Sequence, residues 1–104
     1  LFIEDRRWNE AKVWFHIHGR SGEVEYKSKL GHFKMDWGMG IKNIIAVVEI
    51  PTADHWEKDT MIPLAKRLAV IHFIGKKIVQ QETRGLGTYE IKQTSINIKS
   101  NFYG

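Results

Sequence analysis

The chain has 104 residues, 42% hydrophobic and 27% charged, which is the composition of a globular domain. This length suits one domain with a core of its own, so we expect residues 1–104 to form a single small domain. No apolar run reaches the roughly 18 residues that would predict a membrane-spanning helix. The composition therefore indicates a soluble protein and no membrane partner.

Cysteine is absent, which excludes disulfide frameworks, thiolate metal sites and cysteine nucleophiles. We accordingly expect an intracellular, cytoplasmic protein. Sixteen Lys and Arg against twelve Asp and Glu give a net charge of +4, which favours anionic partners. The basic residues are scattered in short pairs rather than gathered in one block, and a charge of this size also serves solubility.

Two alternating segments predict a hairpin near the beginning of the chain. Residues 12–18 place Val13, Phe15 and Ile17 on one side, as a half-buried strand requires, and residues 23–30 alternate again. Gly19 to Gly22 supplies a four-residue turn between them. A symmetric loop predicts four cross-strand pairs: Ile17 with Val24, Phe15 with Tyr26, His18 with Glu23, and His16 with Glu25.

Two further strands follow. Residues 33–37 alternate apolar with polar side chains and end at a glycine-rich turn. Residues 41–50 contain a run of β-branched residues that is apolar on both faces, which predicts a central strand.

A helix is predicted after Pro51. Asp54 or Asp59 caps its start, apolar spacings of three and four extend it to about residue 84, and Gly85 terminates it. The alternative for residues 68–83 is a pair of strands that turn at Gly75. Residues 89–98 then predict one last strand with a β-bulge.

The predicted fold class is α+β. About five strands form an antiparallel or mixed sheet in the order β-β-β-β-α-β, with one long helix packed on one face. The alternative is a mostly β fold with a short helix.

Two sets of residues could hold a divalent metal. His16 and His18 project to one face of a strand, and Glu23 opposite them could complete three ligands. The alternative is a solvated face on which histidines pair with glutamates. Asp36 and Glu49 lie on consecutive strands before a helix, an arrangement that is similar to that of one large class of metal-dependent nucleases.

That nuclease arrangement is incomplete in this chain. Pro51 occupies the position of the lysine that orients the water in those enzymes, so Lys58 or Lys66 would have to replace it. The alternative is that Asp36 and Glu49 are ordinary solubilising residues. No motif names a reaction, so we expect a binding protein rather than an enzyme, and no cofactor unless one of these sets holds a metal ion.

The leading hypothesis is a small basic binding module for nucleic acid. Flat rings and cations on the outward face of the hairpin are typical of surfaces that stack unpaired bases and contact phosphates. The predicted contact residues are Arg6, Arg7, Lys12, Trp14, Lys27 and Lys29. A further alternative is a protein-interaction or homo-oligomeric assembly component, whose contact residues would be Trp8, Trp14, Phe102 and Tyr103.

Overall fold

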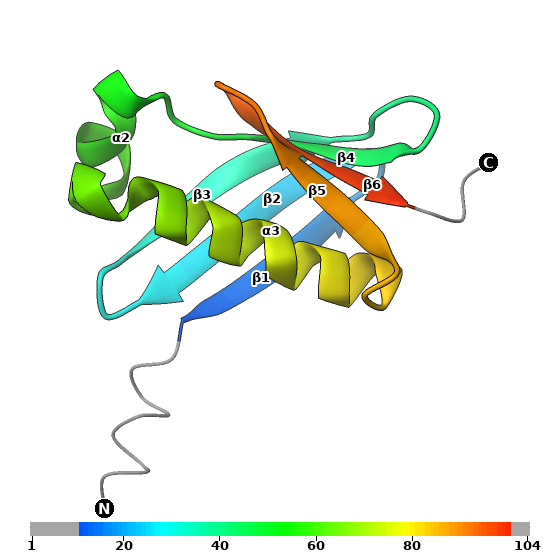
Figure 1. Cartoon of the computed structure of the whole chain (residues 1–104), viewed down its shortest axis with the longest axis horizontal. Helices are drawn as coiled ribbons and strands as arrows, with labels where there is room; N and C mark the ends of the chain where they lie inside the picture. Colours follow the sequence, from blue (N-terminus) through cyan, green and yellow to red (C-terminus); the bar gives the residue numbers. More distant parts are fainter. Residues whose placement is uncertain (1–10, 101–104) are drawn as a thin grey trace, which may run out of the picture.

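The computed structural model describes residues 11–100, which form one α+β fold (Figure 1). The strands of this part of the chain are β1 (Lys12–His18), β2 (Ser21–Ser28), β3 (Gly31–Gly38), β4 (Ile44–Glu49), β5 (Gly87–Ile91) and β6 (Ser95–Ser100). The helices are α2 (Ala53–Thr60) and α3 (Arg67–Thr83), with a 3-10 turn, η1 (Leu64–Lys66), between them. The predicted α+β class and the long helix are confirmed, with six strands here instead of about five. Within residues 11–100, neither helix combines the length and apolar character needed to cross a membrane.

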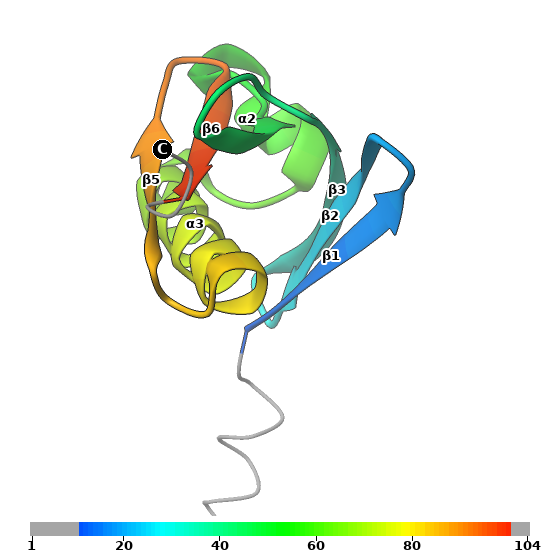
Figure 2. The ribbon, with the colours of Figure 1, turned by 90° about the vertical axis from the view of Figure 1, so that its right-hand side faces the viewer.

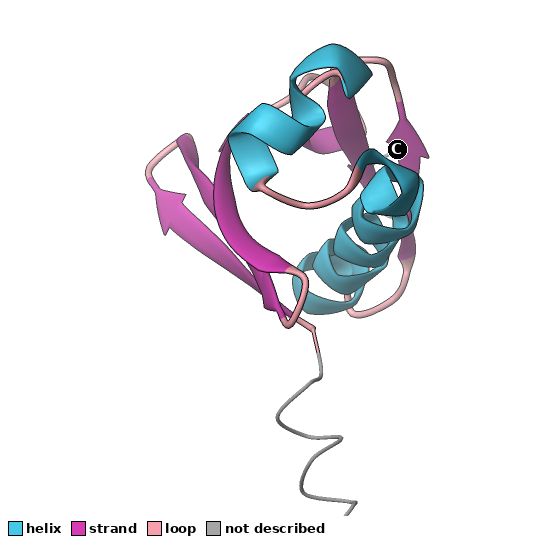
Figure 3. Cartoon of the chain, turned by 90° about the vertical axis from the view of Figure 1, so that its left-hand side faces the viewer, coloured by secondary structure: helices cyan, strands magenta, loops and turns pink. Residues whose placement is uncertain are grey.

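The strands form one antiparallel sheet in the order β1-β2-β3-β4-β6-β5. The buried run predicted at residues 41–50 contains β4, which lies inside the sheet between β3 and β6 as expected. The sheet curls strongly, and α3 lies along its concave side (Figure 2). Both helices are on this side (Figure 3), where α3 contacts β5, β6 and β1. The convex side of β1, β2 and β3 therefore carries no second layer in the described part of the chain.

The core lies between α3 and the concave face of the sheet. Ile71, Ile74 and Ile78 of α3 are 0% exposed, and full burial of an isoleucine side chain stabilises a fold by about 1.5–3 kcal/mol. The strands turn their own apolar residues towards them, among them Val24, Val48, Ile96 and Ile98. Because strand side chains alternate between faces, the same pattern sends the intervening polar residues to the convex face.

The sheet is narrow at its centre. β3 and β4 are joined by only two residue pairs, Trp37 with Val48 and Gly38 with Val47. Apart from these two pairs, the sheet consists of two separate halves, β1-β2-β3 and β4-β6-β5. Trp56 of α2 is fully buried and meets Phe33 of β3 edge to face, with ring centroids 5.5 Å apart. The short helix therefore covers the part of β3 that β4 leaves unpaired.

The carboxyl end of α3 is tied to both edges of the sheet. The side-chain amide of Gln81 donates a 2.9 Å hydrogen bond to the backbone carbonyl of Val13 in β1. The buried hydroxyl of Thr83 donates to Val79 and accepts from the backbone N–H of Gly87, where β5 begins. α3 ends at Thr83, close to the predicted end, but the cap is Arg84 in a left-handed conformation with φ 55°, and Gly85, the predicted cap, follows it with φ 80°.

The predicted register of the first hairpin is wrong by two residues. The loop between β1 and β2 contains two residues, Gly19 and Arg20, and β2 begins at Ser21. Gly22 belongs to the strand, where it pairs with Ile17 and Trp37. Only glycine fits there, because a Cβ would collide with the carbonyl oxygen of His16 and lie 2.7 Å from the indole nitrogen of Trp37, which donates a 2.9 Å hydrogen bond to that carbonyl. The observed pairs are Phe15 with Val24, His16 with Glu23, Ile17 with Gly22 and His18 with Ser21.

The helix after Pro51 is interrupted, so the prediction of a single long helix is wrong in this respect. Met61 adopts a left-handed conformation with φ 62°, and Pro63 follows Ile62, which is 0% exposed. Burial of Ile62 and the missing N–H of Pro63 both favour a break here. The predicted caps are also wrong, because Thr52 occupies the N-cap of α2 and both Asp54 and Asp59 lie within it. The alternative of two strands in residues 68–83 is excluded by α3.

The prediction of one last strand with a bulge is wrong as well. Residues 87–100 form a hairpin of β5 and β6, in which Ile91 pairs with Ile96. The backbone N–H of Lys92 donates a 2.7 Å hydrogen bond to the carbonyl of Ser95 and closes the turn. The alternation of inward and outward side chains shifts between residues 91 and 96. This shift suggested a bulge, but its cause is the turn between β5 and β6.

Replacing Gly75 of α3 with Ala should lower the free energy of unfolding by about 1 kcal/mol. The added Cβ would lie 2.6 Å from Cδ2 of Tyr89 in β5. Overpacking costs about 1–3 kcal/mol, which outweighs the gain of up to about 1 kcal/mol in helix propensity. Urea unfolding measures the difference. With Tyr89→Ala as the background, the ring is gone and the same Gly75→Ala change should become stabilising, while stabilisation in the native background would contradict the packing.

Candidate functional site

The convex face of β1, β2 and β3 carries three rows of outward side chains. The cross-strand register sets the first row as Lys12, Lys27 and His32, the second as Trp14, Glu25 and Lys34, and the third as His16, Glu23 and Asp36. The inward partners that fix this orientation are buried, as Val13, Val24 and Phe33 show. We call the residues of the first two rows the basic platform, because its charges are mainly those of lysine.

Trp14 is the aromatic centre of the basic platform. Its side chain is 39% exposed, although tryptophan is usually one of the most buried residues. Its register neighbour is Glu25, and the first row places Lys12 and Lys27 on the next outward positions of the same two strands. A partly exposed indole with lysines around it can stack on a flat, electron-rich ring while the ammonium groups contact anions.

Glu25 is held between two histidines. Its Oε1 accepts a 3.1 Å hydrogen bond from Nε2 of His16, and its Oε2 accepts a short one from Nε2 of His32. The bonds from His32 and then His16 lower the pKa of Glu25 below its ordinary value, and the charge of Lys34 adds a smaller effect in the same direction. The carboxylate of Glu25 thus joins side chains of β1, β2 and β3. These two hydrogen bonds hold the sheet surface beside Trp14 in place.

The predicted nucleic-acid residues lie in two parts of the chain. Lys12, Trp14 and Lys27 share the convex face, and Lys29 is exposed in the turn between β2 and β3. Arg6 and Arg7 lie outside the described residues. The same holds for Trp8, Phe102 and Tyr103, on which much of the protein-interaction hypothesis depends.

His32 and Lys34 complete the basic platform, and the sequence-based hypothesis missed both of them. A signal for them exists in the sequence. The alternation of β3 puts His32, Lys34 and Asp36 on the face opposite Phe33, and pairing of β3 with β2 then brings that face next to Lys27 and Glu25.

The histidines that we considered as metal ligands are placed differently from expectation. His16 does lie opposite Glu23 in the register, but its ring binds Glu25 instead, and His18 lies opposite Ser21 near the loop. Within residues 11–100, no three or more His, Asp or Glu side chains are arranged so that they could hold one metal ion. A metal set of His16, His18 and Glu23 therefore gains no support from the geometry.

Asp36 and Glu49 do come together. Both line one surface hollow at the place where β3 and β4 separate, and Glu23 and Asp59 line it too. The cation in that hollow is Lys34 rather than Lys58 or Lys66, the two lysines that the nuclease hypothesis needs. Four carboxylates without a common metal geometry form an acidic patch, and we take the nuclease hypothesis no further.

The structure also contains an apolar pocket that the sequence did not indicate. It lies on the concave side, near the carboxyl end of α3, and is lined by residues of β1, β3, β4, β6 and α3. Its position depends on contacts between elements far apart in the sequence, so no local pattern could have located it.

Comparisons with protein-family models, with curated proteins and with solved structures find no match to this chain.

Replacing Glu25 with Gln should lower the melting temperature at pH 7 and have little effect in acid. Because its pKa is lowered in the folded protein, Glu25 contributes stability that is complete above the ordinary glutamate pKa and is lost as the pH falls through the folded-state value. Thermal unfolding of the native protein and of Glu25→Gln, followed by circular dichroism from about pH 2 to pH 7, measures this. Glu23→Gln on the same strand is the control. A melting-temperature difference that is constant across this range would contradict the proposed histidine contacts.

Proposed function

We propose that this protein is a binding module for single-stranded nucleic acid and that the basic platform is its contact surface. The observation that carries the proposal is the position of Trp14, which stands 39% exposed on a sheet face that no other described element covers. Burial of that indole would be the default in a domain of this size, so an exposed one on the polar face of the edge strand β1 favours a role in contact with a ligand.

The charge distribution supports an anionic ligand. Lys12, Lys27 and Lys34 extend from three neighbouring strands, and Lys29 adds a fourth ammonium group in the adjoining turn. Of the acids on the convex face, Glu25 belongs to the platform and is already paired with two histidines. A phosphate backbone that runs across the first row meets lysines without first meeting an unpaired carboxylate.

The chemistry favours single strands over a duplex. A stacking contact needs a base whose flat face is free, and bases in a duplex present only their edges. Trp14 projects from the face of an open sheet. It does not lie on a helix or a two-stranded ribbon that could enter a groove of a duplex. Recognition of this kind is sequence-tolerant, because every base offers a flat face.

An acidic patch next to the basic platform limits where on the convex face a nucleic-acid strand can bind. Glu23 and Asp36 form the third row, and Glu49 and Asp59 line the hollow beside it. Repulsion between these carboxylates and phosphates would keep a bound strand at the Lys12 end of the face. We therefore expect a short contact of a few nucleotides, centred on Trp14.

Trp14→Ala should weaken binding of a single-stranded oligonucleotide by about 1–3 kcal/mol, or roughly five- to 150-fold in Kd, because one stacked base loses its partner. Trp14→Phe should retain most of the affinity. Fluorescence anisotropy with a labelled oligothymidine at low salt gives the Kd values. Leu68→Ala removes another exposed apolar side chain, from α3, and serves as the control. Absence of binding to any polynucleotide at low salt, or an equal loss in both alanine variants, would refute the proposal.

Lys27→Ala should reduce the salt dependence of that binding. Each lost phosphate contact to a single strand lowers the slope of log K against log salt by about 0.7. Titrations at several salt concentrations measure the slope, and Lys76→Ala on α3, an exposed lysine away from the convex face, is the matched control. Equal slopes for the native protein and Lys27→Ala would show that phosphates do not contact the first row.

A further inference from the structure

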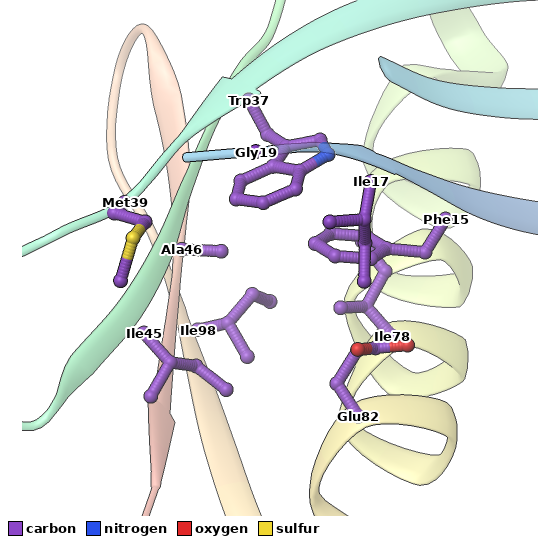
Figure 4. Close-up of a pocket in the computed structure, with 10 residues that line it drawn as sticks. All are labelled: Phe15, Ile17, Gly19, Trp37, Met39, Ile45, Ala46, Ile78, Glu82 and Ile98. Carbon is purple, nitrogen blue, oxygen red and sulfur yellow. The ribbon is translucent and has the colours of Figure 1, made fainter. Parts of the chain in front are cut away.

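A pocket with a volume of about 210 Å³ opens on the concave side of the sheet, near the carboxyl end of α3. It lies between the two halves of the sheet, which the narrow β3-β4 join holds together. Figure 4 shows Ile45 and Ile98 on one side, Ile78 and Glu82 of α3 on the other, and Trp37 above. Its residues come from five elements, so the pocket is a product of the whole fold.

The roof of the pocket is held in place before any ligand arrives. Phe15 and Trp37 stack with ring centroids 4.5 Å apart and an interplanar angle of 23°. The indole N–H of Trp37 is fixed by its hydrogen bond to the carbonyl of His16. Walls that are already fixed spare the protein the entropy of ordering them when a ligand binds, which favours a binding site over a collapsible gap.

The pocket stays open because two of its lining residues are small, and larger side chains at those positions would fill it. Ala46 of β4 lines it with a single methyl group, and Gly19 lies at the hairpin loop above. The base is firm, since Ile78 and Ile98 are both 0% exposed. At the mouth, Ile17 and Met39 are 59% and 60% exposed, so the apolar lining continues out to the surface.

Among residues 11–100, Glu82 is the only charged residue that lines the pocket. Glu82 stands exposed at the rim, and partial desolvation by the apolar wall beside it raises the pKa of its carboxyl above the ordinary value. Within the described part of the chain it has no hydrogen-bond or ion-pair partner. An unpaired carboxylate at the rim of an apolar pocket favours a ligand that brings a positive charge, because the new ion pair offsets the partial desolvation of the carboxylate.

We propose that this pocket binds a small molecule that combines one apolar ring with a protonated amine, the ring between Phe15 and Ile98 and the amine at Glu82. The volume sets the size class, because an apolar cavity of about 150 Å³ holds benzene. A pocket of about 210 Å³ therefore has room for one ring and a short chain. This site is on the opposite face of the sheet from Trp14 and is independent of the nucleic-acid proposal.

The test uses three probes of nearly equal shape: 2-phenylethylamine, its neutral analogue 2-phenylethanol and the anion phenylacetate. Binding to the full chain is followed by NMR of isoleucine methyl groups, since Ile17, Ile45, Ile78 and Ile98 all line the pocket. We expect saturable shifts of these methyls with the amine, weaker binding of the alcohol and the weakest binding of the acid.

Two variants locate the site and its charge. Glu82→Gln should weaken the amine about two- to fivefold, the size of effect expected for an ion pair at an exposed site, and leave the alcohol unchanged. Glu49→Gln, on the exposed end of β4, is the matched control. Met39→Trp should close the mouth and abolish binding of all three probes, whereas Leu68→Trp, at the other end of α3, should not.

Three results would overturn the proposal. The first is the absence of saturable shifts at the pocket methyls with every probe. The second is amine binding that Glu82→Gln leaves unchanged, which refutes the cationic class. The third is binding that survives Met39→Trp, which places the ligand elsewhere.

Discussion

The apolar side of α3 fills the concave face of the sheet, and the positions of the other functional groups follow from that contact. Ile71, Ile74 and Ile78 are fully buried, so the strands around them turn their own apolar residues inwards. Alternation along each strand then forces the remaining side chains to the convex face. Trp14 is exposed because its neighbour Val13 is buried. The basic platform consists of the outward residues of the same strands whose inward residues form the core.

The narrow join between β3 and β4 gives this sheet features that a continuous one would not have. Only two residue pairs hold the halves together, and the pairing of β3 with β4 extends no further on either side of them. The two sides differ in what they contain. On one side the strands separate around Trp56 and leave the acidic hollow that contains Asp36 and Glu49. On the other side the halves approach each other over the end of α3 and enclose the apolar pocket. The acidic hollow and the apolar pocket thus lie on opposite sides of one weakly paired ladder.

The sequence predicted what depends on local periodicity and missed what depends on distant contacts. The wrong hairpin register still assigned every residue to the correct face, because a slip of two preserves the alternation. The predicted proximity of His16 to Glu25 likewise survives as a diagonal hydrogen bond. Pro63 and the alternation of β3 were local signals for the helix break at Ile62 and for the contact of His32 with Glu25, and both went unused. The pocket beside Glu82 depends on packing between segments far apart in the chain, and no local pattern could reveal it.

The hydrogen bond from Gln81 to the carbonyl of Val13 bears on how this protein meets other chains. β1 and β5 are the outermost strands of the sheet, and an outermost strand with free backbone groups is a template for pairing with another strand. Here the helix supplies the missing partner on β1 and packs against β5. A strand from a second molecule would have to displace Gln81 to reach that carbonyl. One carbonyl of the outermost strand β1 is thereby satisfied within the fold, which makes pairing with a strand of another molecule less favourable at that point.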